Sequence, residues 1–553
     1  MSTRAGPAAG TAAATPTEGL ALSVPPGDDQ EGAPRSPRHL ARATRGRARG
    51  EGSSGSPLLR TWLLSFVVIW LASAAWSLAS PMGSAPDEPA HLIRAASLVR
   101  GQLLGTPVRD GSPASKSSVV VKVPQVFARL ANDVQCFQFK PAVPASCQGS
   151  LAGSRKDVAI YTYVGRYPPL YYALVGLPTL VAVSPTGMYL ARLVSAALSA
   201  GMLALAVVSL RRCRGMPLLG AGLALAVTPM AFYLGGVINP SGLEISSAIS
   251  AWAAGMALVS RRGEKAPPPA MVAALGISLI VLMLVRGITP LWALLIGLAL
   301  AALFGHDMRS LARVRSVQGW SAGCVAAGLA ALAWDLYANP FLTEPGSPVP
   351  KGASTSQVFM LALERLDLLV TSSIGQFGWL DTPSPFGVIV TWLGALGAVF
   401  LVGLCFARRR DALVAVATLA AWVVVSFALI FSQARSEGIL GQGRDFMALG
   451  VGIPIVAASV AGERFGARAG ALRLGTAVIA ALFVCQVLDF YGALRRNTVG
   501  MAGPVNAFAS THNAWHPALP ALLLWIVFAI AVGLFALLVR WAAQLQPEAL
   551  PGR

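Results

Sequence analysis

Long apolar runs alternate with short basic clusters along most of the chain. The first run extends from about Leu58 to Ala79, and comparable runs recur up to about residue 545. A helix needs about 20 mostly apolar residues to cross the hydrocarbon core of a bilayer. The pattern therefore predicts an all-α polytopic membrane protein, with a multi-spanning membrane domain over residues 57–545.

The basic clusters set the expected orientation of the crossings. Arginines gather between apolar runs, in the segments 211–214, 261–262, 309–315, 408–410 and 464–473. Cytoplasmic loops carry an excess of Arg and Lys. Placing every cluster in the cytoplasm predicts about twelve crossings with both termini inside. It also predicts large external loops at 81–167 and 338–385 and a short cytoplasmic tail at 546–553.

The apolar stretch 168–210 has two interpretations. Its length would allow two crossings, separated by a break at 184–187, but the arginines that follow it would then lie outside. A single crossing at about 188–210, preceded by a re-entrant or surface helix at 168–184, keeps those arginines inside. We favour the re-entrant or surface helix.

Composition separates a membrane protein from a nucleic-acid binder. Hydrophobic residues make up 55% of the chain and charged residues 12%, with a net charge of +19. Because the positive charge lies in loops between apolar runs, we expect no nucleic-acid partner.

Residues 1–56 are rich in Ala, Gly, Pro, Ser and Arg and predict a disordered basic cytoplasmic arm. The six arginines between Arg35 and Arg49 could contact anionic lipid.

Two adjacent carboxylates and a histidine follow the first expected crossing, in the hexapeptide from Pro86 to His91. Ionisable residues at a membrane face usually mark a functional site. Asp87 and Glu88 are therefore candidate catalytic residues, and His91 is a candidate substrate-binding residue. The alternative is structural: Asp87 would be a suitable N-cap for an amphipathic helix that continues to about Leu104. The two interpretations do not exclude each other.

Further polar motifs fall on the same expected outer face. Arginines can neutralise phosphate, aromatic rings can stack on sugars, and carboxylates can accept protons or hold a divalent cation such as Mg or Mn. These residue types together suit a substrate that carries both phosphate and sugar. The other candidate substrate-binding residues are Arg166, Tyr167, Tyr171, Arg192, Asn239, Glu244, Trp379, Asp381, Gln442 and Arg444, and further phosphate candidates are Arg94, Arg286 and Arg435.

Structural alternatives apply to most of these motifs. Arg192 could reach lipid headgroups with its long side chain, Trp379 could be an interfacial anchor, and the segment 239–242 could be a simple turn. Arg444 could be a solvated loop arginine. Otherwise the glycines beside it would allow the backbone to approach a phosphate closely.

The chain has six cysteines, and two of them, Cys136 and Cys147, fall in the first large external loop. If that loop faces an oxidising exterior, the two are expected to form a disulfide. The other four are isolated and lack metal-ligand spacing. We therefore expect no zinc site.

The order of these motifs resembles a bacterial family of predicted multi-pass membrane proteins of unknown function. The matching segments are PDEPAH, YPPLYY, NPSG, GWLDT and QGRDF, which begin at residues 86, 167, 239, 378 and 442. Two positions depart from the family pattern. Ser241 replaces an Asp, and Asp445 replaces an aromatic residue. Either departure could alter substrate choice or abolish catalysis.

That family in turn is similar to the type C glycosyltransferases, which transfer sugar from a polyprenyl-phosphate carrier outside the cytoplasmic membrane. The similarity implies that Asp87 or Glu88 is a general base or metal ligand, with Arg192 and Arg444 on the carrier phosphate. A lipid tail is expected beside the helix at 168–184. The acceptor would be an envelope glycan, lipid or protein, and the protein would lie in the plasma membrane of a bacterium.

The sequence is also compatible with two other functions. A transporter or flippase of a lipid-linked glycan would use the same charges on a headgroup in transit, although the chain shows no convincing internal repeat. A non-catalytic scaffold for envelope assembly would tolerate the changes at Ser241 and Asp445.

Overall fold

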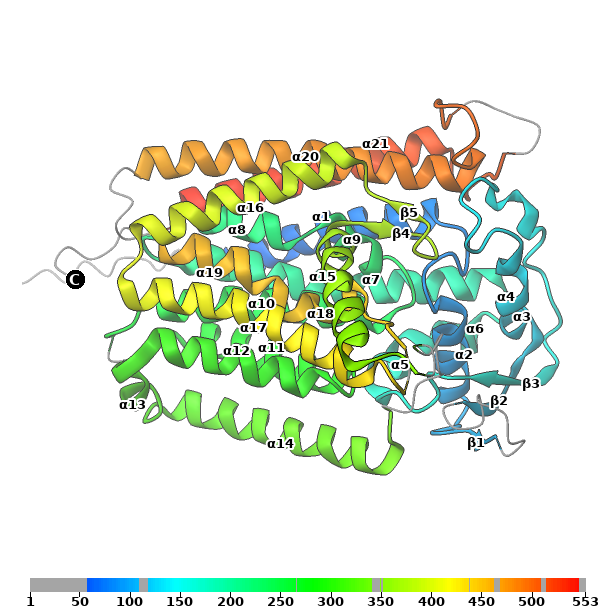
Figure 1. Ribbon diagram of the computed structural model, residues 1–553, viewed down its shortest axis with the longest axis horizontal. Coiled ribbons are helices and arrows are strands. Elements are labelled where there is room, and N and C mark those ends of the chain that lie inside the picture. The colour runs from blue at the N-terminus through cyan, green and yellow to red at the C-terminus, as the bar shows by residue number, and fades with distance from the viewer. Residues whose placement is uncertain are drawn as a thin grey trace, which may run out of the picture. The chain divides into compact units, whose positions relative to one another are not determined.

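The structure is a computed structural model that describes residues 57–546, apart from 109–117, 265, 341–348, 350–351, 437, 462–467 and 509–513. The predicted arm at 1–56 and almost all of the predicted tail at 546–553 lie outside the described residues. Within the described part the chain is a bundle of helices that carries two small antiparallel sheets (Figure 1). The prediction of an all-α polytopic membrane protein is confirmed.

Ten helical segments in the described residues are long and apolar enough to cross a membrane. They correspond to α1 (Pro57–Ala79), α7 (Pro185–Arg212), α10 (Pro240–Val259), α12 (Thr289–Phe304) continuing through α13 (Met308–Leu311), α14 (Arg315–Ala338), α16 (Phe386–Phe406), α17 (Arg409–Gln433), α18 (Gly443–Gly450) with α19 (Gly452–Val460), α20 (Arg468–Val499) and α21 (Ala521–Gln544). A shorter apolar helix, α11 (Pro269–Val285), and the broken pair α8 (Leu219–Ala226) and α9 (Pro229–Gly235) occupy two further expected crossings.

The segment expected to be re-entrant is short and interrupted. It forms α5 (Pro169–Gly176) and α6 (Pro178–Val181), and α6 starts at a proline. Thirteen residues from 169 to 181 extend only about 20 Å as a helix, less than the roughly 30 Å of a hydrocarbon core. This length is consistent with a helix that does not cross.

The segment between α1 and α5 forms a small folded layer at one end of the bundle, called here the loop end (Figure 1). Its three-stranded sheet has the order β1-β2-β3, and both neighbouring pairs are antiparallel. A second sheet pairs β4 with β5. The elements of these layers are α2 (Glu88–Leu98), β1 (Thr106–Pro107), β2 (Val119–Pro124), α3 (Gln125–Ala128), α4 (Leu130–Asp133), β3 (Asp157–Thr162), α15 (Thr355–Ile374), β4 (Gln376–Phe377) and β5 (Thr382–Pro383).

Helix α10 is the central element of the bundle, and every one of its residues is buried. Its small residues allow neighbouring helices to approach closely, as in other membrane bundles. A Cβ added at Gly255, for example, would lie 2.5 Å from the side chain of Leu300 in α12. The helix begins at Pro240, whose missing N–H is not needed in the first turn. Its N-cap, Asn239, therefore lies inside the protein at the loop end.

The loop end also contains a disulfide. Cys136 and Cys147 form a disulfide that closes a loop in this layer.

Helix α2 begins one residue after Asp87, but the Asp87 side chain makes no capping hydrogen bond to it. Asp87 itself adopts a left-handed backbone conformation with φ of 63°. The alternative in which Asp87 acts as a side-chain N-cap is therefore wrong, and this carboxylate points elsewhere.

Candidate active site

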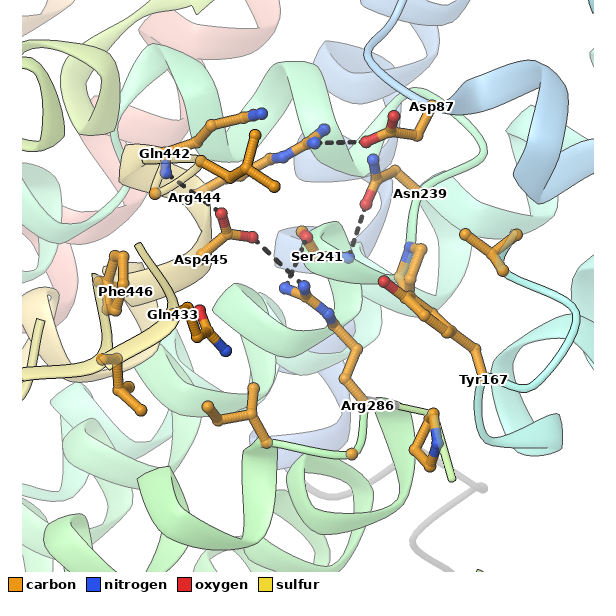
Figure 2. Close-up of a pocket in the computed structure, with 18 of the residues that line it drawn as sticks. Asp87, Tyr167, Asn239, Ser241, Arg286, Gln433, Gln442, Arg444, Asp445 and Phe446 are labelled. Atoms are coloured by element: carbon orange, nitrogen blue, oxygen red, sulfur yellow. Dashed lines mark hydrogen bonds and ion pairs between the residues drawn. The ribbon is translucent and has the colours of Figure 1, made fainter. Parts of the chain in front are cut away.

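A cavity of about 460 Å³ opens at the loop end, where five segments that are distant in sequence meet (Figure 2). It is lined by the turn before α2, the segment after β3, the start of α10, the α11–α12 connection, and the end of α17 with the start of α18. Its polar lining residues include Asp87, His91, Tyr163, Tyr167, Asn239, Ser241, Arg286, Gln442, Arg444 and Asp445. Seven of these are site residues expected from the sequence: Asp87, His91, Tyr167, Asn239, Arg286, Gln442 and Arg444.

Asp87 faces the cavity because of its left-handed backbone, which aspartate tolerates better than most residues. Its carboxylate accepts a hydrogen bond of 2.6 Å from the Tyr163 hydroxyl and forms an ion pair with Arg444. Burial raises its pKa, but the positive charge of Arg444 and these hydrogen bonds lower it by more, so the pKa lies below its usual value. Asp87 is therefore ionised at neutral pH.

His91 lies about one turn further along α2. Its Nδ1 is 2.8 Å from the hydroxyl of Tyr172, and the two rings are stacked with centroids 5.9 Å apart. Burial lowers the pKa of His91 to about 3, and the positive charges of Arg444 and Arg286 act in the same direction. His91 is therefore neutral at physiological pH and offers the cavity an uncharged imidazole.

Two arginines supply the positive charge of the cavity, and each is held by a carboxylate (Figure 2). Arg444, in the first turn of α18, also donates to the carbonyl of Pro86 at 3.3 Å. Arg286 follows the end of α11 and contacts three side chains: it donates to Glu244 at 2.9 Å, to Asp445 at 3.2 Å and to Ser241 at 3.3 Å. Asp445 thus shares Arg286 with Glu244 and Ser241 on the cavity wall.

The glycine beside Arg444 serves packing between helices. The backbone N–H of Gly443 donates to the Ser372 hydroxyl of α15 at 2.9 Å. A Cβ at Gly443 would lie 2.4 Å from the backbone nitrogen of Ser373. At Gly443 the close approach is therefore to α15, whereas Gly441, the other glycine of the motif, lines the cavity.

Glu88 and Arg192 pair with each other away from the cavity. Both side chains are fully buried, and Arg192 donates to the two carboxylate oxygens of Glu88 at 2.6 Å each. Glu88 also accepts from the backbone N–H groups of Gly83 and Ile238 at 3.0 Å. Arg192 binds the carbonyls of Ser77, Ser80 and Pro81 as well. The geometry therefore argues against the catalytic role expected for Glu88 and the phosphate contact expected for Arg192.

The remaining expected residues do not line the cavity. Tyr171 bonds to Ser195, Arg166 donates to the carbonyl of Ala338, Trp379 donates to the carbonyl of Gly83, and Asp381 pairs with Arg496. Glu244 lies behind Arg286, and Arg94 donates to three backbone carbonyls. Arg435 is exposed and donates to the carbonyl of Ala353 and the hydroxyl of Thr355.

Two cavity features differ from the sequence expectations. Tyr163 was not expected, because it belongs to none of the motifs; the turn after β3 brings it to Asp87. The apolar part of the cavity wall was expected beside 168–184 but comes from other segments. Its residues are Ile288, Trp292, Leu429, Ile430, Leu440 and Phe446, from α12, α17 and the start of α18.

A divalent cation at Asp87 and Glu88 does not fit this geometry. The two carboxylates point to different arginines, and only Asp87 lines the cavity. Among the described residues, no three His, Cys, Asp or Glu side chains are grouped so as to hold a metal.

Comparison with known proteins gives one family match. The profile of a family described as "Predicted membrane protein (DUF2142)" matches residues 70–453, which is most of the chain and includes every motif named above. The chain belongs to the DUF2142 family. No curated protein matches it.

One solved structure to which this DUF2142 protein is similar is ArnT from Cupriavidus metallidurans, determined with bound undecaprenyl phosphate. The sequence identity is 14%, the TM-score is 0.39, and the match covers 88% of this chain and 76% of ArnT.

Proposed function

We propose that this protein transfers a sugar from a polyprenyl-phosphate carrier to an envelope acceptor, at the cavity that contains Asp87. The loop end would face the outside of a bacterial plasma membrane. The observation that carries the proposal is an ionised carboxylate facing a cavity that also holds two arginines and an apolar wall. This combination suits a substrate with an acidic head and a hydrocarbon tail.

Each part of the carrier has a matching part of the cavity. Arg444 and Arg286 would bind the phosphate, since a guanidinium has five N–H donors and the contacts described above use only some of them. The apolar residues of α12 and α17 would contact the first isoprene units. Tyr163 and Tyr167 would lie beside the sugar.

The reaction would proceed by direct displacement. The acceptor hydroxyl attacks the anomeric carbon, its proton passes to the Asp87 carboxylate, and the bond from that carbon to the phosphate oxygen breaks. The polyprenyl phosphate leaves with the electron pair, and the arginines stabilise its charge. Attack opposite the leaving group inverts the anomeric configuration.

Carrier binding would also activate Asp87. In the unbound protein Arg444 lowers the proton affinity of Asp87, which makes the carboxylate a weak base. A phosphate that takes over part of the Arg444 guanidinium would weaken this ion pair. The pKa of Asp87 would then rise toward the range in which a carboxylate accepts a proton efficiently.

The test compares envelope glycans in a strain that lacks the gene and in complemented strains, by mass spectrometry. Complementation would use wild type, Asp87→Asn, and Asp133→Asn as a matched control. Asp133 also pairs with an arginine, Arg129, but does not line the cavity. We expect a missing sugar that wild type and Asp133→Asn restore and Asp87→Asn does not, at equal membrane levels.

The alternatives predict different results. Rescue by all three variants would contradict catalysis by Asp87 and would favour a transporter or a scaffold. Accumulation of an unused polyprenyl-phosphate sugar in the Asp87→Asn strain would support the transferase, because the donor is made but not consumed.

A further inference from the structure

Two residues with a strained backbone, Phe139 and Leu380, lie in neighbouring segments at the loop end. Among the described non-glycine residues, only Asp87, Phe139, Asn339 and Leu380 have positive φ angles. Aspartate and asparagine tolerate this conformation, whereas for Phe139 and Leu380 it is strained. Such strain often marks a functional surface. Phe139 contacts Trp379, the residue immediately before Leu380, with ring centroids 5.7 Å apart.

The Phe139 side chain is exposed to solvent. Its exposed fraction is 63%, and the Trp379 ring beside it is half-buried. The two rings meet edge to face at 63°. The orientation of the Trp379 ring is fixed, because its indole N–H donates to the carbonyl of Gly83 at 3.1 Å. The pair therefore presents aromatic surface that does not collapse into the core.

One buried arginine joins the two segments that carry these rings. Arg496, 2% exposed, donates to the carbonyl of Phe137 at 2.9 Å and to that of Val143 at 3.1 Å, which fixes the segment around Phe139. The same guanidinium donates to Asp381 at 2.7 Å, which fixes the turn around Trp379. The disulfide from Cys136 to Cys147 closes the Phe139 segment. These contacts make the pair rigid, which limits the entropy lost on binding.

The helix that carries Arg496 is longer than a hydrocarbon core is thick. Helix α20 has 32 residues and ends at Val499, so it is about 48 Å long, against roughly 30 Å of hydrocarbon. Arg496 is in its last turn, at the loop end of the bundle (Figure 1). The aromatic pair held by Arg496 is therefore at the end of a helix that is long enough to reach past the lipid tails.

We infer that Phe139 and Trp379 form a surface that binds the glycan acceptor by stacking on its sugar rings. A rigid, exposed aromatic pair outside the membrane suits the C–H face of a pyranose or furanose, which needs contact area without charge. Trp379 is bonded to Gly83, four residues before Asp87, so this surface is tied to the loop that carries the candidate base. The inference rests on the proposed function, which it deepens by assigning the acceptor class.

The test measures binding of neutral oligosaccharides to the full chain in lipid nanodiscs, by saturation-transfer NMR. The probes are linear tetrasaccharides of α-1,4-glucose, β-1,4-glucose, α-1,6-mannose and α-1,5-arabinofuranose. Phe139→Gly removes the ring while allowing the left-handed backbone, and Trp379→Leu removes the second ring. Tyr161→Ala, which removes an aromatic residue 59% exposed on β3, is the matched control.

We expect at least one probe to bind, with affinity about three- to tenfold weaker in Phe139→Gly and Trp379→Leu and unchanged in Tyr161→Ala. No binding by wild type, or equal loss in Tyr161→Ala, would overturn the inference. A benzoylphenylalanine photo-crosslinker at position 139 supplies a second readout in cells. Adducts with glycan would support the inference, and adducts with lipid or protein alone would overturn it.

Failure of this inference can be told apart from failure of the proposed function. Asp87→Asn should keep oligosaccharide binding and lose sugar transfer. Transfer that persists in Phe139→Gly at saturating acceptor, with a raised KM, is the expected signature of a binding surface. Transfer without any probe binding would leave the transferase intact and remove only the aromatic surface.

Discussion

The clearest prediction concerns Glu88, which is adjacent to the candidate base but has a different partner. In Glu88→Gln the carboxylate charge is lost while Arg192 stays buried, with 0% of either side chain exposed. An amide could still accept from one backbone N–H, but it cannot accept both guanidinium bonds of 2.6 Å and both backbone bonds of 3.0 Å. Removing one partner of a buried ion pair typically costs about 3–5 kcal/mol.

The assay is thermal unfolding in detergent, followed with a thiol-reactive fluorogenic dye. Cys213 and Cys485 are buried free thiols that unfolding would expose, and the exposed Cys405 would first be replaced by serine. We expect Glu88→Gln to lower the unfolding midpoint markedly. The partly buried pair Arg129–Asp133 provides the control, since Arg129 still reaches solvent and Asp133→Asn should therefore cost much less than Glu88→Gln.

A double variant separates charge pairing from general damage. Replacing both Glu88 and Arg192 by glutamine removes the uncompensated charge, so stability should recover by about 0.5–3 kcal/mol relative to the single variant. The reasoning would be refuted if Glu88→Gln unfolded like wild type and yet abolished sugar transfer. Glu88 would then act in the reaction itself.

Three further predictions follow from the cavity. Asp87→Asn should lower kcat for sugar transfer about 100- to 10,000-fold without lowering the unfolding midpoint as Glu88→Gln does; wild-type kcat in this variant would exclude Asp87 as the base. The pKa of His91 is lowered from its usual 6.5 to about 3 in the folded protein. Below pH 6.5 the unfolded chain therefore binds a proton at His91 that the folded protein does not bind. Folding stability should fall as the pH falls from 6.5. This loss reaches about 2 kcal/mol at pH 5, and His91→Gln should flatten the profile of unfolding midpoint against pH in that range. Asp445→Asn removes a carboxylate that competes with phosphate for Arg286; since this pair is partly exposed, we expect polyprenyl phosphate to bind up to about fivefold more tightly, measured by displacement of a fluorescent carrier analogue.

The sequence predicted the membrane architecture because length and hydropathy determine it locally. The runs that became α1, α16 and α21 are long enough that only a spanning helix satisfies their backbone in a bilayer. The motifs predicted part of the cavity for a similar reason. Asn-Pro and Gln-Gly segments must interrupt helices, and the structure brings Asn239 and Gln442 to the same cavity.

The roles of Asp87 and Glu88 could not be separated from the sequence. The two residues are adjacent and chemically alike, but α2 begins between them. The left-handed backbone at Asp87 turns its side chain to the cavity, whereas Glu88, the first helical residue, faces Arg192. That partner lies 104 positions along the chain, a distance over which no local pattern predicts pairing.

The two departures from the family pattern converge on one guanidinium. Ser241 and Asp445 belong to different helices, yet both contact Arg286, at 3.3 Å and 3.2 Å. An aspartate at position 241 would lie where Ser241 does and would face the same arginine. Glu244 of α10 also pairs with Arg286, and Asp445 adds a carboxylate from α18, so negative charge around Arg286 is retained without an aspartate at 241. We infer that Ser241 and Asp445 compensate each other, which argues against the interpretation that these two changes abolish catalysis.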